Sequence, residues 1–312
     1  MTVVDPLKGI AGLKGALRYV RAYRDHVFVV KMGGEVVAET AALEQVSGQL
    51  ALLSSLGIRL VVVHGGGPQA TALSRKLGHE PVIVAGRRVT DDTALEVAKM
   101  VYAGSLNVDI LSALRAQGVP AVGLSGVDAD LLTAHRRPPV SIVDDNGQTR
   151  TVDFGHVGDI DRVDPRVLQA LLEGRFVPVV ASLAGDDDGK VYNVNADTVA
   201  ESLAVALKAQ KLIFLTGAPG ILRDRNDPTS LVTFADPDDL APLLASGAIA
   251  GGMRPKVEAC IRAATGGVER THILGGLSSD ALLLELFTGA GCGTMIVGRK
   301  EKATYLGVDL AG

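Results

Sequence analysis

The sequence predicts an α/β protein, a three-layer αβα sandwich built on a mostly parallel central sheet. Short runs rich in Val and Ile alternate along the chain with segments of helical periodicity, and 47% of the 312 residues are hydrophobic. Such runs are typical of strands buried on both faces, and parallel strands need a crossover, usually a helix, between them. The 37 glycines fit the many tight turns of such a fold.

The predicted elements follow one another from end to end. Ile10, Leu13 and Leu17 recur at helical spacing, which predicts an amphipathic helix over about residues 9–24, ahead of the first strand. Strands are expected at His26–Lys31, Arg59–His64, Pro120–Leu124, Phe176–Ala181, Lys211–Thr216, Thr271–Leu274 and Thr294–Val297. Helices are expected at about residues 40–56, 68–78, 91–117, 165–174, 195–209, 252–265 and 278–288.

Residues 130–157 break this alternation. Segments of β type lie around the turn sequence Asp145-Asn146-Gly147, which predicts a protruding hairpin that we expect to act as a lid over a site. Asp186-Asp187-Asp188-Gly189 is the best candidate for a turn between two lobes. The sequence therefore predicts an N-terminal helix in residues 1–25, an N-terminal lobe in 26–185 and a C-terminal lobe in 186–312, within one continuous domain.

Charge and composition exclude several classes of protein. Lys and Arg number 31 against 35 Asp and Glu, a net charge of −4, so no general positive field attracts nucleic acid or an anionic membrane. Cys260 and Cys292 are the two cysteines, a usage typical of a reducing compartment. No apolar run approaches the ~20 residues of a membrane helix, and we expect a cytoplasmic protein.

Two strand ends in the first half have the features of an anion site. One strand ends in Lys31 and runs directly into Gly33-Gly34; the next runs into Gly65-Gly66-Gly67-Pro68 at the start of a helix. Glycines let backbone N–H groups approach an anion, and the free N–H groups of a helix N-terminus favour negative charge. A plain surface lysine, and glycines needed only for tight turns, are the alternative interpretations.

The run from Gly65 to Ala70 also fits the loose Gly-x-Gly-x-x-Ala pattern of dinucleotide-binding enzymes. This alternative is disfavoured because the run does not follow the first strand, and the region ~20 residues further on holds Arg87 and Arg88 rather than an acidic strand end. Arg88 precedes a long helix, and its guanidinium is suited to a bidentate contact with a carboxylate. A surface arginine is the alternative.

The second half repeats the pattern. Asn193, Asn195 and Asp197 place two amides and a carboxylate at a helix start, where a plain cap would account for one of them. Strand Lys211–Thr216 leads into a glycine-rich exit, and Gly251-Gly252 with Lys256 opens another helix. Two sites that combine paired glycines with a lysine, one in each half, suggest one phosphoryl group reached from two sides.

Other catalytic signatures are missing from the sequence. It contains no Gly-x-x-x-x-Gly-Lys-[Ser/Thr] loop, no Gly-x-Ser-x-Gly motif and no metal-ligand spacing of His and Cys. His64 is better explained as a packed, hydrogen-bonded residue at a strand end than as a base.

Taken in order, these motifs resemble the amino-acid-kinase family, from near His26 to Val297. Within that family the resemblance implies ATP-dependent phosphorylation of the side-chain carboxylate of N-acetyl-L-glutamate to N-acetyl-L-glutamyl 5-phosphate, in arginine biosynthesis. The motifs that establish the resemblance are Lys31–Gly34, Val63–Gln69, Arg88–Thr90, Ala121–Gly126, Tyr192–Asp197, Gly251–Lys256 and Leu282–Thr288.

The resemblance also implies roles for individual residues. Lys31 and Lys256 would stabilise the transition state, and Asp197 would orient both lysines. N-Acetyl-L-glutamate would be held by Gly66, Gly67, Arg88 and Asn193. ATP, accompanied by Mg²⁺, would be bound by Gly33, Gly34, Thr216, Gly217, Gly220 and Gly252, and no side chain is assigned as a metal ligand.

A helix ahead of the first strand resembles the arginine-inhibited type within this family, in which such helices join dimers into a hexameric ring. The resemblance then implies a homo-oligomer and an arginine effector bound beside this helix. The matching positions are Lys211, His272, Glu285 and Gly293. The alternative is that the helix packs on its own subunit and that Glu285 is a solvated helix residue.

Two rival functions remain open at this point. One is a related kinase whose aminoadipate or glutamate substrate is carried by a small acidic protein in lysine biosynthesis; Arg136 and Arg137 on the expected lid would suit such a carrier. The other is a catalytically weak sensor of arginine or nucleotide, favoured only by Gly217, which stands where the family usually has an aspartate. Met32, Glu35 and Ser105 depart from the family pattern as well.

Overall fold

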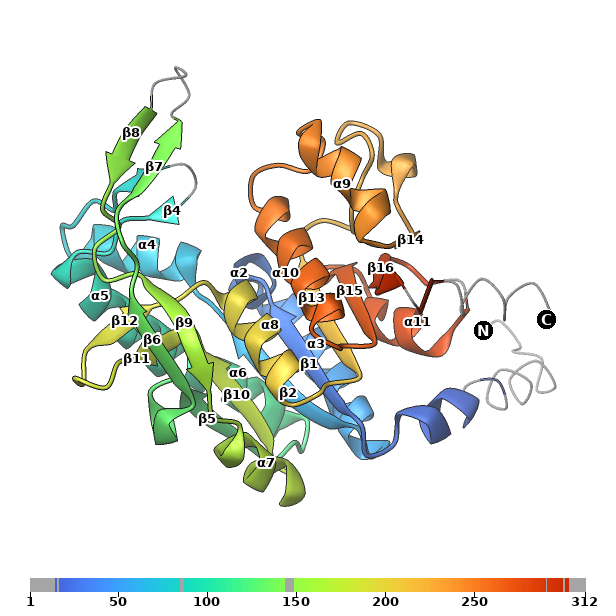
Figure 1. Ribbon diagram of the computed structural model, residues 1–312. Coiled ribbons are helices and arrows are strands. Elements are labelled where there is room, and N and C mark those ends of the chain that lie inside the picture. Colours follow the sequence, from blue (N-terminus) through green and yellow to red (C-terminus); the bar gives the residue numbers. More distant parts are fainter. Residues whose placement is uncertain are drawn as a thin grey trace.

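The structure, a computed structural model, describes residue 15 and residues 17–84, 87–143, 149–289, 291–299 and 301–302. Its centre is an eight-stranded sheet in the order β14-β16-β15-β13-β1-β2-β10-β5 (Figure 1). All neighbouring strands are parallel except β15 and β16. The strands of this sheet are β1 Val27–Met32, β2 Arg59–His64, β5 Ala121–Ser125, β10 Val177–Ala181, β13 Lys211–Thr216, β14 Phe234–Ala235, β15 Arg270–Gly275 and β16 Thr294–Val297.

Helices cover both faces of this sheet, which confirms the predicted three layers. Phe28 and Val30 of β1 face the apolar cluster that contains α3, α6 and α11, whereas Val29 faces the cluster of α7, α8, α9 and α10. The alternation follows from the two-residue period of a strand. The helices are α2 Gly34–Ala38, α3 Thr40–Ser55, α4 Gly67–Lys76, α5 Asp92–Ala98, α6 Asn107–Ala116, α7 Arg166–Glu173, α8 Ala196–Ala206, α9 Pro237–Ala245, α10 Met253–Thr265 and α11 Ala281–Phe287.

The central strands bring the motifs of both halves to one edge of the sheet. β1 lies between β2 and β13, and Lys31 is in register with Val63 on one side and Phe214 on the other. Because these strands are parallel, the segments that follow Lys31, His64 and Thr216 all leave the sheet at its carboxyl edge, where open α/β folds bind ligands.

A second, four-stranded sheet has the order β12-β11-β6-β9. The expected hairpin region appears as β6, which pairs antiparallel with β9, and as the protruding β7–β8 hairpin between them in sequence (Figure 1). The turn Asp145-Asn146-Gly147 lies outside the described residues. These strands are β6 Leu132–Arg136, β7 Val140–Val143, β8 Thr149–Val152, β9 Gly158–Val163, β11 Leu183–Gly185 and β12 Val191–Asn193.

The turn expected between two lobes has a more local task. Asp186–Gly189 joins β11 to β12, which are antiparallel neighbours in the second sheet. Asp186 Oδ1 accepts the N–H groups of Asp188 and Lys190, and the hydroxyl of Tyr192 donates to Oδ2. A run of Asp and Gly is typical of a hairpin turn as well as of a boundary between lobes, so the composition does not distinguish the two. The division of the chain at 185/186 stays a prediction.

The helical segment expected over about residues 91–117 is confirmed at Asp92–Ala116, but it is not one regular α-helix. α5 passes into a π-helical segment, Lys99–Leu106, with a kink at Gly104 (φ −103°, ψ −109°), before α6 begins. Glycine explains the kink because it adopts backbone conformations that other residues avoid. The stretch Asp92–Ala116 is long and apolar enough to cross a membrane by length and composition alone; here Val97, Val101, Ile110 and Leu114 of this stretch are buried in the core.

Further elements complete the description. Short pieces that the apolar pattern did not indicate are β3 Ile83–Val84, β4 Arg87–Arg88, the 3₁₀ turns Asp128–Asp130 and Pro228–Ser230, and the helices α2 and α9. Of the helix expected over residues 9–24, residues 15 and 17–23 are helical, and residues 9–14 and 16 lie outside the described part of the chain.

Candidate active site

Two lysines from opposite halves of the chain meet at one buried carboxylate. Lys31 Nζ at the end of β1 lies 2.8 Å from Oδ1 of Asp197, and Lys256 Nζ on α10 lies 3.2 Å from Oδ2. The side chains of Lys31 and Asp197 are only 9% and 7% exposed, and that of Lys256 is 18% exposed. The structure therefore brings together the three residues for which the sequence predicted a common catalytic role.

Local structure explains why Asp197 can reach both lysines. The side chain of Asn195 caps α8 by accepting the N–H groups of Asp197 and Thr198. Asp197 is thereby freed from capping and projects from the first helical turn. Burial alone would raise its pKa, but the charges of Lys31 and Lys256 and their hydrogen bonds outweigh burial and hold the pKa of this carboxyl below its ordinary value.

The glycine loop after β2 forms a second part of the site. Gly66 caps α4, and Pro68 occupies its first turn. A Cβ on Gly66 would lie 2.7 and 2.8 Å from ring carbons of Tyr102, whereas a Cβ on Gly67 would meet nothing within 4 Å. The two glycines therefore have different tasks: one packs against the π-helical segment, and the other leaves space open.

Arg88 lies beside this loop with one end of its guanidinium anchored. Nη2 donates to the carbonyl of Gly67 at 3.0 Å and to Thr71 Oγ1, while Nη1 is buried and has no hydrogen-bond partner in the described part of the chain. A buried, unpaired nitrogen on a positive side chain costs free energy unless a ligand binds it. This arrangement fits a carboxylate, as the sequence predicted.

Asn193 is the last residue of β12 and contacts the segment that follows Arg88. Its Nδ2 donates to Thr90 Oγ1 at 3.1 Å, and Thr90 is fully buried. The N–H of Thr90 donates to the carbonyl of Phe154, and the N–H of Asn193 to that of His156. These bonds join the segments of Arg88 and Asn193, although more than a hundred residues separate them in sequence.

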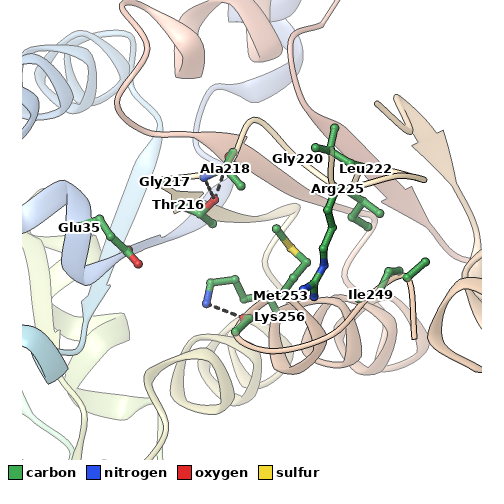
Figure 2. Close-up of a pocket in the computed structure, with 13 residues that line it drawn as sticks. Glu35, Thr216, Gly217, Ala218, Gly220, Leu222, Arg225, Ile249, Met253 and Lys256 are labelled. Atoms are coloured by element: carbon green, nitrogen blue, oxygen red, sulfur yellow. Dashed lines mark hydrogen bonds between the residues drawn. The ribbon is translucent and has the colours of Figure 1, made fainter. Parts of the chain in front are cut away.

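A cavity of about 420 Å³ opens next to Lys256, at the ends of β13 and α10 (Figure 2). Figure 2 shows Glu35 at one side and Arg225 at the other, with the Thr216–Ala218 turn between them and Met253 and Lys256 on the opposite wall. Its size falls within the range of small-molecule sites. Of the predicted nucleotide-binding residues it includes Thr216, Gly217, Gly220 and Gly252, together with Ala218, Ile221, Leu222, Ala248 and Ile249.

Gly33 and Gly34 are not among the residues that line this cavity. A Cβ on Gly33 would lie 2.8 Å from the carbonyl oxygen of Leu215, and one on Gly34 would lie 2.9 Å from Cδ of Pro68. Both glycines permit close contact between chain segments at the sheet edge, and a nucleotide contact for them stays a prediction.

The four residues predicted for an arginine effector also lie together, at the opposite end of β13. His272 Nδ1 donates to Glu285 Oε1 at 2.8 Å, and Lys211 Nζ lies 3.4 Å from His272 Nε2. The N–H groups of Cys292 and Gly293 donate to Glu285 Oε2. With its side chain only 5% exposed, Glu285 is not the solvated helix residue that the alternative interpretation expected.

Burial dominates the electrostatics of this cluster. It lowers the pKa of Lys211 to about 7 and, aided by the charge of Lys211, that of His272 to about 4. Burial opposes the charge on Glu285, but His272 and two backbone N–H groups overcome it and lower the pKa to about 2. Lys211 Nζ also lies 5.0 Å from the ring centroid of Tyr23, on the helix ahead of β1. This helix therefore contacts the cluster within its own subunit.

Sequence reasoning missed several residues of these sites. Arg225 lines the cavity from an irregular segment without periodicity. The hydroxyl groups of Thr71 and Thr90 accept hydrogen bonds from Arg88 and Asn193, respectively. Threonine is common in helices and loops, so its presence at these positions indicates no site. Tyr102 reaches Gly66 through the unexpected π-helical segment. No local pattern marks such residues, because their role depends on which segments meet in the fold.

Comparisons with known proteins found related sequences and related structures. A sequence profile described as "Amino acid kinase family" matches residues 26–275. Over 289 residues the chain is 50% identical to a protein named acetylglutamate kinase from Myxococcus xanthus (strain DK1622), an alignment that covers 92% of this chain and 94% of the relative.

Solved structures of similar fold include N-acetylglutamate synthase from Neisseria gonorrhoeae in two complexes. The complex with coenzyme A and N-acetyl-glutamate has a TM-score of 0.78 and 30% identity and covers 92% of this chain but 63% of that one. The complex with coenzyme A and L-arginine has a TM-score of 0.76 and 28% identity, and covers 92% of this chain and 65% of that one. This chain thus spans less than two thirds of the length of the synthase chains.

Proposed function

This chain belongs to the amino acid kinase family, and we propose that it transfers the γ-phosphoryl group of ATP to the side-chain carboxylate of N-acetyl-L-glutamate. The product is N-acetyl-L-glutamyl 5-phosphate, an acyl phosphate, and the reaction belongs to arginine biosynthesis. The Myxococcus xanthus relative is 50% identical to this chain over 94% of its own length, and it is named for this activity.

The chemistry needs no general base. A carboxylate is already ionised at pH 7 and attacks as it is: one of its oxygens forms a bond to the γ-phosphorus while the bond from that phosphorus to the β,γ-bridging oxygen breaks, and ADP leaves with the electron pair. The barrier comes from bringing two anions together and from the charge on the γ-phosphoryl oxygens. Preorganised positive groups and N–H donors lower such a barrier.

The observation that supports this function best is the convergence of Lys31 and Lys256 on Asp197. Asp197, whose side chain is buried, holds both ammonium groups at the carboxyl edge of the sheet, between the glycine loop and the cavity. Two ammonium groups fixed in this way supply positive charge from two sides of a phosphoryl group without any reorganisation during the reaction.

Arg88 and the glycine loop support the choice of substrate. N-Acetyl-L-glutamate has two carboxylates, of which one reacts and the other is available for recognition. The unpaired Nη1 of Arg88, the open space at Gly67 and the amide of Asn193 suit the carboxylate that does not react. Arg88 is therefore proposed to orient the substrate so that the reacting side-chain carboxylate of N-acetyl-L-glutamate points towards Lys31.

The cavity of Figure 2 is the proposed ATP site. Among the described residues no group of three His, Cys, Asp or Glu side chains lies close enough to hold a metal ion. We propose that Mg²⁺ arrives on the nucleotide, because Mg²⁺ keeps several waters and binds mainly to phosphates and one or two carboxylates. Glu35, which faces the cavity, is the carboxylate placed to meet it, and the ion supplies further charge neutralisation when bound.

Steady-state release of ADP tests this function. Purified protein with MgATP is assayed with N-acetyl-L-glutamate, L-glutamate and N-acetyl-L-aspartate, and Arg88→Lys is assayed in parallel. We expect turnover with N-acetyl-L-glutamate above the other two acids, and a KM for it raised about tenfold or more in Arg88→Lys, because lysine cannot make the bidentate contact. Equal rates for all three acids would reject the proposed substrate.

No observation favours the carrier-bound substrate of the rival kinase. Arg136 is paired with Asp153, and Arg137 with Asp159, both at hydrogen-bond distance. These carboxylates neutralise the two arginines that an acidic carrier would need. The catalytically weak sensor is disfavoured too, because Lys31, Asp197 and Lys256 are in place.

Arginine is the proposed effector. It is bound in the structure of a synthase 28% identical to this chain, and the buried carboxylate of Glu285 supplies the negative charge and the acceptor oxygens that a guanidinium requires. Calorimetry with L-arginine, with Glu285→Gln as the variant, tests this: binding to the parent protein and at least tenfold weaker binding to the variant are expected. The homo-oligomer, its hexameric ring and a cytoplasmic location remain predictions.

A further inference from the structure

His64 is fully buried at the end of β2 and takes part in a chain of hydrogen bonds. Its Nδ1 lies 2.8 Å from the carbonyl oxygen of Gly65, and its Nε2 lies 3.0 Å from Nδ2 of Asn107. Asn107 Nδ2 also donates to the carbonyl of Val179 at 3.1 Å. The chain thus links β10, the start of α6 and β2 to the glycine loop.

The partners fix every proton in this chain. A carbonyl oxygen can only accept, so the amide of Asn107 must present Nδ2 to Val179, and the Nδ1 of His64 must bear the proton that it donates to Gly65. Nε2 is then unprotonated and accepts from Asn107. The imidazole is neutral, and burial, with a further contribution from the charge of Lys31, lowers its pKa to about 4.

This tautomer determines the orientation of one peptide unit in the loop. In a planar trans peptide the C=O and the next N–H point in opposite directions. Because the Gly65 carbonyl points to the imidazole, the N–H of Gly66 points away from it. Within the described part of the chain no group accepts this N–H or that of Gly67, and Pro68 has none.

We propose that His64 and Asn107 are positioning residues that hold the Gly65–Gly66 peptide so that the Gly66 N–H is presented to the anionic substrate. The inference rests on the proposed function, since the anion is N-acetyl-L-glutamate. The imidazole acts through the loop and does not touch the substrate, and no proton moves during the reaction.

The surroundings of Asn107 support a specific role. Gly123 of β5 has no side chain where a Cβ would clash with Oδ1 of Asn107, so the sheet makes room for this amide. Gly66 itself is held on its other side by the ring of Tyr102 and by Leu106. The loop is therefore fixed from two directions, by packing and by hydrogen bonding.

Two substitutions of His64 separate this role from a packing role. Gln keeps one donor and one acceptor at the end of its side chain, whereas Leu fills a comparable volume and offers neither. We expect kcat/KM for N-acetyl-L-glutamate to stay within about tenfold of the parent in His64→Gln and to fall by on the order of 10²–10³ in His64→Leu, the loss typical of one preorganised donor. KM for MgATP should be unchanged in both.

Leu114→Ala on α6 serves as the control, because Leu114 is fully buried on the same helix as Asn107 and its loss destabilises the fold without touching the hydrogen-bonded chain. It should retain kcat/KM. Equal losses in His64→Gln and His64→Leu, or a loss in Leu114→Ala as large as in His64→Leu, would overturn the proposal.

A spectroscopic measurement tests the geometry independently of turnover. The nitrogen chemical shifts of ¹⁵N-labelled histidine, assigned with His64→Gln, distinguish a protonated from an unprotonated ring nitrogen. We expect His64 to have its proton on Nδ1 at pH 6–8. In Asn107→Asp a carboxylate faces Nε2, and we expect the chemical shift of Nε2 to change to that of a protonated nitrogen. A proton on Nε2 in the parent protein would refute the proposal. Absence of turnover with N-acetyl-L-glutamate would instead refute the proposed function, and the spectrum would still decide the arrangement.

Discussion

Lys31 and Asp197 form a buried ion pair, 2.8 Å between Nζ and Oδ1, across the junction of β1 and α8. Their elements meet because β1 is the central strand of the sheet and α8 packs on it. Lys256 on α10 completes the group. An ammonium group in this position has a counter-charge in the resting protein and a fixed place when a phosphoryl group arrives.

Replacing either lysine should reduce the chemical step. Lys31→Met and Lys256→Met are each expected to lower kcat by on the order of 10²–10³, the size of the loss of one preorganised electrostatic donor. The double variant should lose less than the product of the two, because the residues act as a unit. Lys76→Met, at an exposed position on α4, is the control and should keep the parent rate. Steady-state kinetics measure all four.

Asp197→Asn keeps the shape of the side chain but removes its charge. Two buried ammonium groups then lack a counter-charge, so the free energy of unfolding should fall by about 3–5 kcal/mol, as for other broken buried pairs. Urea titration measures this. A loss below 1 kcal/mol at pH 7 would show that the lysines find other partners.

The pH dependence of the same pair has a definite sign. The folded pKa of Asp197 lies below its ordinary value of 3.8, so the unfolded chain binds the proton first as pH falls. The stability contributed by Asp197 is present above pH 4 and is lost as pH falls through the folded pKa. Asp197→Asn should therefore flatten the stability curve below pH 4 relative to the parent protein.

Gly66 and Gly67 should respond differently to the same substitution. Gly66→Ala places a methyl group against Tyr102 and should cost about 1–3 kcal/mol of stability through overpacking, together with weaker substrate binding. Gly67→Ala places it in open space that the substrate is proposed to occupy, so KM for N-acetyl-L-glutamate should rise while stability is kept. Thermal unfolding and steady-state kinetics of Gly66→Ala and Gly67→Ala distinguish a packing role from a substrate-binding role. Equal losses of stability in both variants would contradict these different roles.

Much of the fold follows from the sequence, and the reason is visible in particular strands. β1, β2 and β13 are runs of apolar residues buried on both faces, so their pattern is unambiguous. α9, by contrast, begins with an Asp236 capping box and contains Pro242 inside the helix, a mixture that local patterns assign poorly. The π-helical segment depends on the backbone of one glycine, Gly104, which periodicity does not detect.

The candidate site was predictable to the extent that its residues stand in short motifs. Lys31, Arg88, Asn193, Asp197 and Lys256 belong to such motifs, and their meeting follows from the strand order. Asn107 and Thr71 could not be found, because their importance arises from a carbonyl or a guanidinium contributed by a distant segment. Asp186–Gly189 shows the opposite failure, since a turn composition indicates a turn but not which elements it joins.

Lys211 should make stability rise with pH. Its folded pKa of about 7 lies below its ordinary value of 10.5, so between these values the unfolded chain binds more protons than the folded one, and the free energy of unfolding increases. Lys211→Met should remove this rise between about pH 7 and 10.5 and raise the stability at pH 7. Melting temperatures across that range measure it. An unchanged slope in the variant would mean that Lys211 is charged in the folded state.

Trapping the acyl phosphate tests the central claim most directly. Hydroxylamine converts an acyl phosphate to a hydroxamate, and hydroxamate and ADP are quantified together from one reaction with MgATP and N-acetyl-L-glutamate. The proposed mechanism predicts one hydroxamate for each ADP with the parent protein and the loss of both products in Lys31→Met. Release of ADP without hydroxamate, or a full yield of hydroxamate from Lys31→Met, would contradict it.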